Sequence, residues 1–310
     1  MVASKIVECI INHSSGNAQT PFIEADGGLC LVARQWNKFS ERPLTIFDRN
    51  SHFSDLHKHW FPKNSNIPIR NINIHSYHNA ESLPPLTIET VPYRNGWHNP
   101  VPGYTLFATS TLSMIKYLVF RCSQQWQSKN QKLLEFHNIR PEFFLLVWPK
   151  TTNYLTMPFE KKKNLKTFRM ANLAFRVMFE CQKIQSFPIK ALFPWSPTTK
   201  IKDGEVDLIK IRPKEDIGLN VDDKYENYEF WFFLQLLEFP RGKKFIDLME
   251  DYFPGIGLDL ILEFNLTVET STKEIHPNQI VPIFRLLISQ QDFKMSNFAV
   301  SAYLTFIGKM

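Results

Sequence analysis

Glycines, cysteines and long apolar runs are scarce in this chain of 310 residues. Its 11 glycines leave few for loops that wrap a phosphate or cofactor in backbone N–H groups. The four cysteines include no C-x-x-C pair, which argues against structural zinc. The longest apolar stretch is Phe230–Leu237, far shorter than the roughly 20 residues that cross a bilayer. We therefore expect neither a metal site nor a membrane partner.

Signatures of common catalytic sites are also missing. The sequence has no G-x-S-x-G motif, and no Ser/His/Asp set can be assigned. Gly255-Ile-Gly257 lacks a third glycine and a preceding strand, so it predicts a turn between helices. Five histidines gather between residues 51 and 79, with the spacing of neither a metalloprotease nor a zinc finger. They are His52, His57, His59, His75 and His78.

Hydrophobic and aromatic residues, in contrast, are plentiful, and basic residues are unevenly placed. The chain is 44% hydrophobic and 14% aromatic, which is typical of a folded globular protein. Its net charge is +6, yet residues 150–214 alone hold 14 Lys and Arg against 5 Asp and Glu. Such a segment favours a polyanionic partner such as nucleic acid. A solvated basic surface explains the charge equally well.

The first two thirds of the chain alternate strand-like and helix-like segments, which predicts a doubly wound α/β sheet. The expected strands are Phe22–Ala25, Leu44–Phe47, Ile67–Ile74, Tyr104–Ala108, Phe143–Trp148 and Val206–Ile211. The expected helices between them include Met1–Ile11, Gly28–Trp36, Ser51–Trp60 and Thr111–Gln125.

The character of the chain changes after Pro213, where apolar residues recur at helical spacing. The expected helices there are Tyr225–Leu237, Lys243–Tyr252, Leu258–Phe264 and Pro277–Ser289. We therefore predict two domains, an α/β domain over 1–213 and a helical domain over 214–310.

An acidic residue and two glycines follow the first predicted strand, as in folds that bind a nucleotide-like cofactor. Glu24 lies within that strand, and Gly27 and Gly28 come directly after it. Asp48 follows the second strand, where an acid can accept hydrogen bonds from ribose hydroxyls. An ordinary turn from a strand into a helix explains the two glycines about as well.

Aromatic residues also lie near basic ones in several segments. Tyr93, Arg94 and Trp97 belong to the Pro-, Asn- and Gly-rich segment 79–103, while Lys161–Lys163 and Trp195 lie in the basic segment. Single-stranded nucleic acid is held by rings that stack on bases and by cations that follow the backbone. Each ring taken alone is better explained by packing, so only the combination with the local charge favours nucleic-acid binding.

Three later segments resemble the rRNA adenine N6-dimethyltransferase family. They are FPWSPTTKIKDGEVDLIKIRPK from Phe193, YEFWFFLQLLEFPRGKKFIDLM from Tyr228, and IHPNQIVPIFRLL from Ile275. PFIEADGGL and LTIFDRNSHF then match the family's first two strands in order. The resemblance implies a Rossmann-like class I S-adenosylmethionine methyltransferase fold followed by a small, all-helical C-terminal domain.

The sequence departs from the family at two motifs. Its glycine loop is about two residues shorter than the family's, and the segment Phe107, Ala108, Thr109, Ser110 replaces the Asn-Leu-Pro-Tyr motif that positions the target amine. We therefore expect no catalytic residues and a protein that is not an enzyme. Glu24, Gly27, Gly28 and Asp48 are then expected to form a vestigial S-adenosylmethionine site, with no cofactor required. A mitochondrial rRNA adenine N6-dimethyltransferase that uses S-adenosylmethionine remains the alternative.

With these departures, the chain is most similar to a degenerate branch of the family, mitochondrial transcription factor B, which includes the fungal mitochondrial transcription initiation factors. The resemblance implies a factor of the mitochondrial matrix that works with a single-subunit mitochondrial RNA polymerase and holds the melted non-template strand of promoter DNA. RNA as a further partner and a nuclear location stay open. The expected nucleic-acid-binding residues are Tyr93, Arg94, Trp97, Lys161, Lys162, Lys163, Trp195, Arg241, Lys243 and Lys244.

Overall fold

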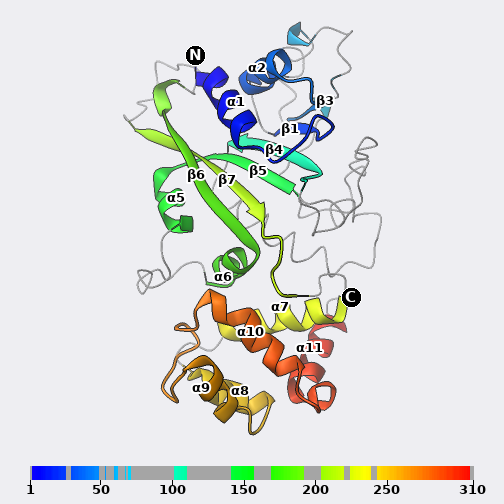
Figure 1. Cartoon of the computed structure of the whole chain (residues 1–310), viewed down its shortest axis with the longest axis vertical. Coiled ribbons are helices and arrows are strands. Elements are labelled where there is room, and N and C mark those ends of the chain that lie inside the picture. Colours follow the sequence, from blue (N-terminus) through cyan, green and yellow to red (C-terminus); the bar gives the residue numbers. More distant parts are fainter. Residues whose placement is uncertain are drawn as a thin grey trace. The chain divides into compact units, whose positions relative to one another are not determined.

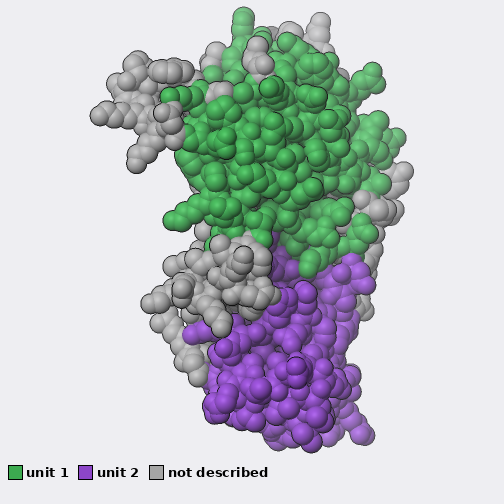
Figure 2. All heavy atoms as spheres, turned by 60° about the vertical axis from the view of Figure 1, so that its left-hand side comes forward, with its two compact units in different colours: residues 1–118, 128–157, 179–215 green, residues 119–127, 158–178, 216–310 purple. Residues whose placement is uncertain are grey.

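A computed structural model describes residues 2–25, 29–48, 53, 59–61, 67, 69–70, 101–109, 141–156, 169–191, 204–219, 224–238 and 243–307. The chain forms two compact units (Figure 2). The sheet unit comprises residues 1–118, 128–157 and 179–215, and the helical unit comprises residues 119–127, 158–178 and 216–310. The units are defined by contacts, so the predicted division at residue 213 into separately folding domains stays a prediction.

The sheet unit is built on a seven-stranded sheet in the order β3-β2-β1-β4-β5-β7-β6 (Figure 1). β1 to β5 are parallel, and β7 runs antiparallel between β5 and β6. The strands are β1 Phe22–Ala25, β2 Leu44–Phe47, β3 Ile69–Arg70, β4 Tyr104–Thr109, β5 Pro141–Val147, β6 Phe179–Pro188 and β7 Glu205–Pro213. The strand order reverses at β1, so this is the predicted doubly wound sheet.

One face of this sheet packs against the first two helices, α1 (Val2–His13) and α2 (Leu31–Phe39). Phe22 of β1 stacks on Trp36 of α2 with ring centroids 3.9 Å apart. A single apolar cluster continues from these helices across β1, β2, β4, β5, β6 and β7. The short helix α5 (Pro149–Thr156) follows β5 and contacts β6 and β7. The 3-10 turn η6 (Ile189–Ala191) follows β6.

The helical unit contains six α-helices and one 3-10 turn among the residues that the structure describes. They are α6 Arg169–Met178, α7 Lys224–Glu238, α8 Phe245–Tyr252, α9 Gly257–Phe264, α10 Pro277–Ile288, η7 Phe293–Met295 and α11 Asn297–Ile307. Phe230, Phe233, Phe284 and Phe298 are fully buried and form the aromatic centre of this unit. Gly255 has φ +94° and ends the turn into α9, which agrees with the turn predicted there.

A buried ion pair lies near the amino ends of the parallel strands. Glu142 is the second residue of β5, and its Oε1 is 2.9 Å from the Lys210 ammonium of β7. The Ser14 hydroxyl and the Ser15 backbone N–H, which follow α1, donate hydrogen bonds to the same carboxylate at 2.6 and 2.9 Å. The Lys210 ammonium also donates to the His13 carbonyl, which caps the carboxyl end of α1. One carboxylate therefore joins two strands to a helix.

Arg42 extends this network to β4 and to the start of β2. Its guanidinium donates to the Ser14 hydroxyl at 3.1 Å, to the Thr105 hydroxyl at 2.7 Å and to the Thr20 carbonyl at 2.8 Å. The same group lies 5.2 Å from the centre of the Trp36 ring. Arg42 thus connects the polar network to the stacked aromatic pair beneath α2.

These contacts determine the direction in which the pKa of Glu142 is shifted. Burial would raise its pKa, but the hydrogen bonds from Ser14, Lys210 and Ser15, together with the Lys210 charge, outweigh burial and lower it. A lowered folded pKa stabilises the protein fully above the pKa of the unfolded chain, about 4.3 for Glu. This stabilisation is lost as the pH falls through the lower, folded pKa.

We predict that Glu142→Gln lowers the free energy of unfolding at pH 7 by about 3 kcal/mol, because it leaves the Lys210 ammonium buried without its counter-charge. Urea unfolding followed by circular dichroism measures this change. The variant should also lose less stability than the wild type when the pH drops from about 5 to 3.

Glu180→Gln is the matched control, since Glu180 pairs with Arg212 at 2.8 Å but both side chains are largely exposed. This variant should lower the free energy of unfolding by less than about 1 kcal/mol. If the two variants lowered the free energy of unfolding equally, the structural role of Glu142 would be contradicted.

Candidate cofactor and nucleic-acid site

The carboxyl ends of β1, β2, β4 and β5 lie side by side at one edge of the sheet, because these four strands are parallel and adjacent. The order reverses at β1, whose neighbours are β2 and β4. In open α/β sheets, ligands bind in the crevice outside the carboxyl ends at such a reversal. This edge, here called the carboxyl edge, is therefore where a functional site is expected.

Glu24 lies in β1 near the carboxyl edge, and its side chain hydrogen-bonds to the backbone of helix α2. Its Oε2 accepts a hydrogen bond from the Ala33 backbone N–H in the first turn of that helix. The residue before the helix, Cys30, has φ 47° and provides no side-chain cap. Glu24 therefore supplies from a neighbouring strand the carboxylate that normally caps a helix start.

Asp48 follows β2 directly and is 6% exposed. Because side chains alternate along a strand, Asp48 lies on the same sheet face as Ile46, whose partner across β1 is Glu24. The two acids are close enough to interact. Burial, opposed by the Ala33 hydrogen bond and assisted by the Asp48 charge, raises the pKa of Glu24 to about 8. The raised pKa favours the protonated form of Glu24, and Asp48 lies beside it directly after β2.

The other two predicted cofactor residues, Gly27 and Gly28, lie outside the described residues. The next thiol along the chain, that of Cys30, is fully buried, and burial raises its pKa. A buried thiol with a raised pKa is unreactive. At the cofactor position, the structure therefore brings together the two acids that the sequence predicted.

Two of the four residues predicted to stand in place of the catalytic motif lie in the core of β4. Phe107 and Ala108 of β4 are 3% and 1% exposed, and Phe107 belongs to the apolar cluster beneath α1 and α2. They are core residues of the strand and not site residues. Thr109 is the exposed end of β4 at the carboxyl edge, and Ser110 lies outside the described part of the chain.

Most of the predicted nucleic-acid-binding residues lie outside the described residues as well. These are Tyr93, Arg94, Trp97, Lys161, Lys162, Lys163, Trp195 and Arg241. The two that are described lie in the helical unit, where Lys243 pairs with Asp251 and Lys244 pairs with Glu269. All four of these side chains are at least partly exposed, so solvent screening keeps both pairs weak.

Trp148 is a candidate that the sequence interpretation treated only as the end of a strand. It follows β5 at the carboxyl edge and is 54% exposed, although all seven residues of β5 are buried. Its carbonyl accepts hydrogen bonds from the Thr151 and Thr152 N–H groups in the first turn of α5, which fixes its backbone. Lys150 is exposed in the same turn. A Trp-Pro pair directly after a buried strand is the signal that could have identified it.

The described residues offer neither a metal cluster nor a membrane span. They contain no group of three or more His, Cys, Asp or Glu placed to hold a metal ion. Among them, no helix is both long and apolar enough to span a bilayer. The carboxyl edge, with its two acids and its exposed indole, is therefore the candidate site of the sheet unit.

The fold of this chain is similar to that of a solved structure. No protein-family model and no curated protein sequence matches the chain. Among solved structures, the 23S rRNA methyltransferase ErmE matches 92% of this chain and 96% of its own, with 12% identity and a TM-score of 0.58. The chain therefore has the class I methyltransferase fold with a helical C-terminal region, as predicted.

Two further structures match less closely. A precorrin-6y C5,15-methyltransferase of Geobacter metallireducens has 9% identity and a TM-score of 0.34, covering 68% of this chain and 85% of that one. A putative RNA methyltransferase of Pyrococcus horikoshii has 7% identity and a TM-score of 0.33, covering 68% and 84%. Such distant similarities concern parts of the fold.

These findings correct the prediction that the chain is not an enzyme. The structure matched over nearly the whole chain, that of ErmE, is a methyltransferase structure. The fold is an enzyme fold compatible with S-adenosylmethionine, and the inferred loss of activity is withdrawn.

We predict that Glu24→Gln flattens the dependence of stability on pH. A carboxyl group with a raised folded pKa stabilises the fold fully below its unfolded pKa, and this contribution is lost as the pH rises through about 8. The wild type should therefore lose stability between about pH 5 and 8, whereas the Gln amide stays neutral and still accepts from Ala33. Urea unfolding at several pH values measures the slope.

Glu8→Gln, at an exposed position of α1, is the control and should keep the wild-type slope. If Glu24→Gln also kept that slope, Glu24 would be ionised in the folded protein and the protonated carboxyl would be ruled out.

Proposed function

We propose that this protein is a mitochondrial transcription initiation factor built on a methyltransferase fold. In this proposal it works with a single-subunit mitochondrial RNA polymerase in the matrix, helps to melt promoter DNA and holds the open non-template strand. The identity of the polymerase partner rests on the resemblance of the segments IETVPYRNGWHNP, residues 88–100, and PWSP, residues 194–197, to the transcription-factor branch. The carboxyl edge contributes the chemistry of strand binding.

The observation that carries the proposal is the exposed indole of Trp148 at the carboxyl edge. Its backbone is held by two hydrogen bonds from α5, so its position on the edge is set before any ligand binds. Lys150 in the first turn of α5 is exposed and supplies a cation for a phosphate. A single strand requires both an aromatic ring and a cation, because one stacks on a base and the other follows the backbone.

The energy of strand opening makes such a surface necessary. Each base-pair step contributes about 1.4 kcal/mol of stacking, so opening several steps costs several kcal/mol. A factor without ATP recovers this cost by binding the open strand more tightly than the duplex. Stacking of one base on an aromatic ring contributes roughly 1–3 kcal/mol, so a few such contacts with phosphate contacts suffice.

The decisive experiment mixes the full chain with its cognate mitochondrial RNA polymerase and promoter DNA carrying 2-aminopurine near the start site. We expect the fluorescence increase of base unstacking only when both proteins are present. Absence of any increase on duplex DNA, combined with no binding to a pre-melted bubble, would overturn the proposal.

Variants at Trp148 test the contribution of the carboxyl edge. Trp148→Ala should weaken binding to single-stranded DNA about 5- to 100-fold, and Trp148→Phe should restore most of it, because both residues present a flat π-face. Fluorescence anisotropy of a labelled oligonucleotide measures the affinity. Phe39→Ala is the control, since Phe39 is 62% exposed but ends α2, at the opposite edge of the sheet. Equal affinities for Trp148→Ala and the control would remove Trp148 from the interface.

A second function is favoured by the pair of acids at the reversal of the strand order. Asp48 follows β2 where an acid accepts hydrogen bonds from ribose hydroxyls, and Glu24 caps α2 beside it. These residues fit S-adenosylmethionine, which would supply an electrophilic methyl group. The chain would then be an rRNA adenine N6-dimethyltransferase, with Trp148 available to stack on an unpaired base.

Calorimetry with S-adenosylmethionine and methyl transfer to an rRNA hairpin test this second function. Micromolar binding that is weakened about 10-fold or more by Asp48→Ala, together with methylated adenine, would establish it. Binding without methyl transfer would leave the cofactor as a ligand of the fold, and no binding would exclude this second function.

A further inference from the structure

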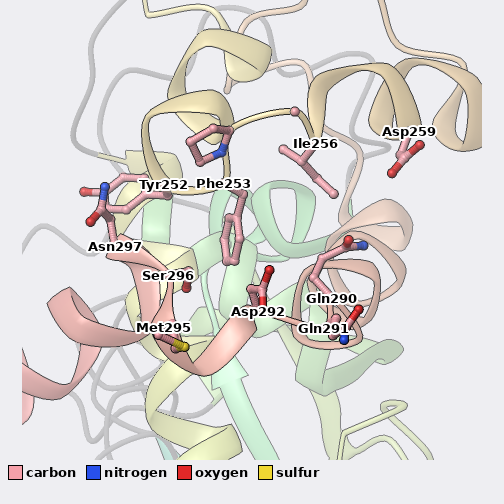
Figure 3. Close-up of a pocket in the computed structure, with 12 residues that line it drawn as sticks. Tyr252, Phe253, Ile256, Asp259, Gln290, Gln291, Asp292, Met295, Ser296 and Asn297 are labelled. Carbon is pink, nitrogen blue, oxygen red and sulfur yellow. The ribbon is translucent and has the colours of Figure 1, made fainter.

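A groove of about 490 Å³ opens in the helical unit, independent of the carboxyl edge (Figure 3). One wall is the turn from α8 into α9, from Tyr252 to Ile256, with Asp259 beside it. The other wall is the corner from the end of α10 through η7 to α11, which includes Asp292 and Met295. We call this site the α8–α11 groove.

The floor of the groove is apolar and its walls are fixed. Phe253 and Ile256 are 7% and 4% exposed, and the Phe253 ring stacks on Phe293 with centroids 5.8 Å apart. The Glu250 carboxylate accepts hydrogen bonds from the backbone N–H groups of Gly255 and Gly257 at 2.7 and 2.6 Å, which holds the turn. The groove is therefore formed before any ligand arrives.

Apolar side chains also project from the helices around the groove. Met295 is 83% exposed at its edge, and Leu258 and Leu262 of α9 are 64% and 71% exposed. Leu258 and Leu262 are four residues apart, so they lie on one face of α9. Exposed apolar side chains at the groove and on α9, the helix that contributes Asp259 to it, indicate a surface that is covered in the functional state.

The groove is lined by acidic and not by basic residues. Its lining residues include two Asp and no Lys or Arg, although the chain as a whole is +6. Asp259 contributes a carboxylate from one wall and Asp292 one from the other (Figure 3). Nucleic acid is repelled by such a surface, whereas a cationic segment is attracted to it.

We propose that the α8–α11 groove binds a basic, amphipathic segment of a partner protein. An apolar side chain of the segment enters between Phe253, Ile256 and Met295, while flanking Lys or Arg side chains pair with Asp259 and Asp292. The flexible thioether of Met295 adapts to the shape of the apolar side chain. The occupant is therefore a protein segment, with neither a nucleic acid nor a membrane required.

The test uses the full chain and a fluorescein-labelled synthetic helix with one leucine face and one lysine face. We expect saturable binding, measured by anisotropy, that weakens about 5- to 20-fold in the double variant Asp259→Asn/Asp292→Asn. Met295→Ser should weaken it by a similar factor through the apolar contact. Hydrogen exchange should show protection on binding at residues 252–259 and 290–297.

Glu8→Gln/Glu41→Gln is the matched control, because it removes two exposed carboxylates from the sheet unit and changes the net charge equally. It should bind the lysine helix like the wild type, and a helix with glutamate in place of lysine should not bind. The proposal is overturned if the lysine helix fails to bind, if both double variants lose affinity equally, or if protection falls elsewhere. None of these outcomes depends on polymerase or on DNA.

Discussion

The sheet unit depends on the burial of one carboxylate, that of Glu142. A carboxylate inside a sheet is tolerated only when hydrogen-bond donors and a cation surround it. Here the donors come from the segment after α1 and the cation comes from β7, so α1, β5 and β7 meet where the charge is satisfied. Arg42 connects the same point to β2 and β4. The amino ends of β2, β4 and β5 are thereby coupled to one another and to β7.

Along the parallel strands, the residues that stabilise the fold and the residues of the candidate site lie at opposite ends. The amino ends carry the ion network, in which every donor and acceptor serves the fold. The carboxyl ends carry Glu24, Asp48 and Trp148, and the exposed indole of Trp148 contributes little to folding. Residues at the carboxyl ends can therefore vary while the sheet is retained.

The sequence predicted the elements whose local pattern agrees with their environment. β1 and β2 match the predicted bounds because they are short, apolar and buried on both faces, and α7 and α10 match closely because of their helical spacing. β6 was missed because most of its residues are polar or exposed, so it alternates too weakly to be recognised. Asp48 and Glu24 were predictable from their place after or within a strand. Trp148 and the α8–α11 groove were not, because exposure and concavity arise only from packing.

The segments of the two units alternate along the chain, and this limits how the protein can be divided into fragments. Helix α6 belongs to the helical unit and contacts α7 and α10, yet it precedes β6 and β7 in the sequence. A fragment that begins at residue 214 would lack α6, so the apolar surfaces of α7 and α10 that contact it would be exposed. A fragment that ends at residue 213 would contain α6 without α7 and α10. The helical unit is therefore better studied by joining residues 158–178 to the later segment through a linker than by truncation.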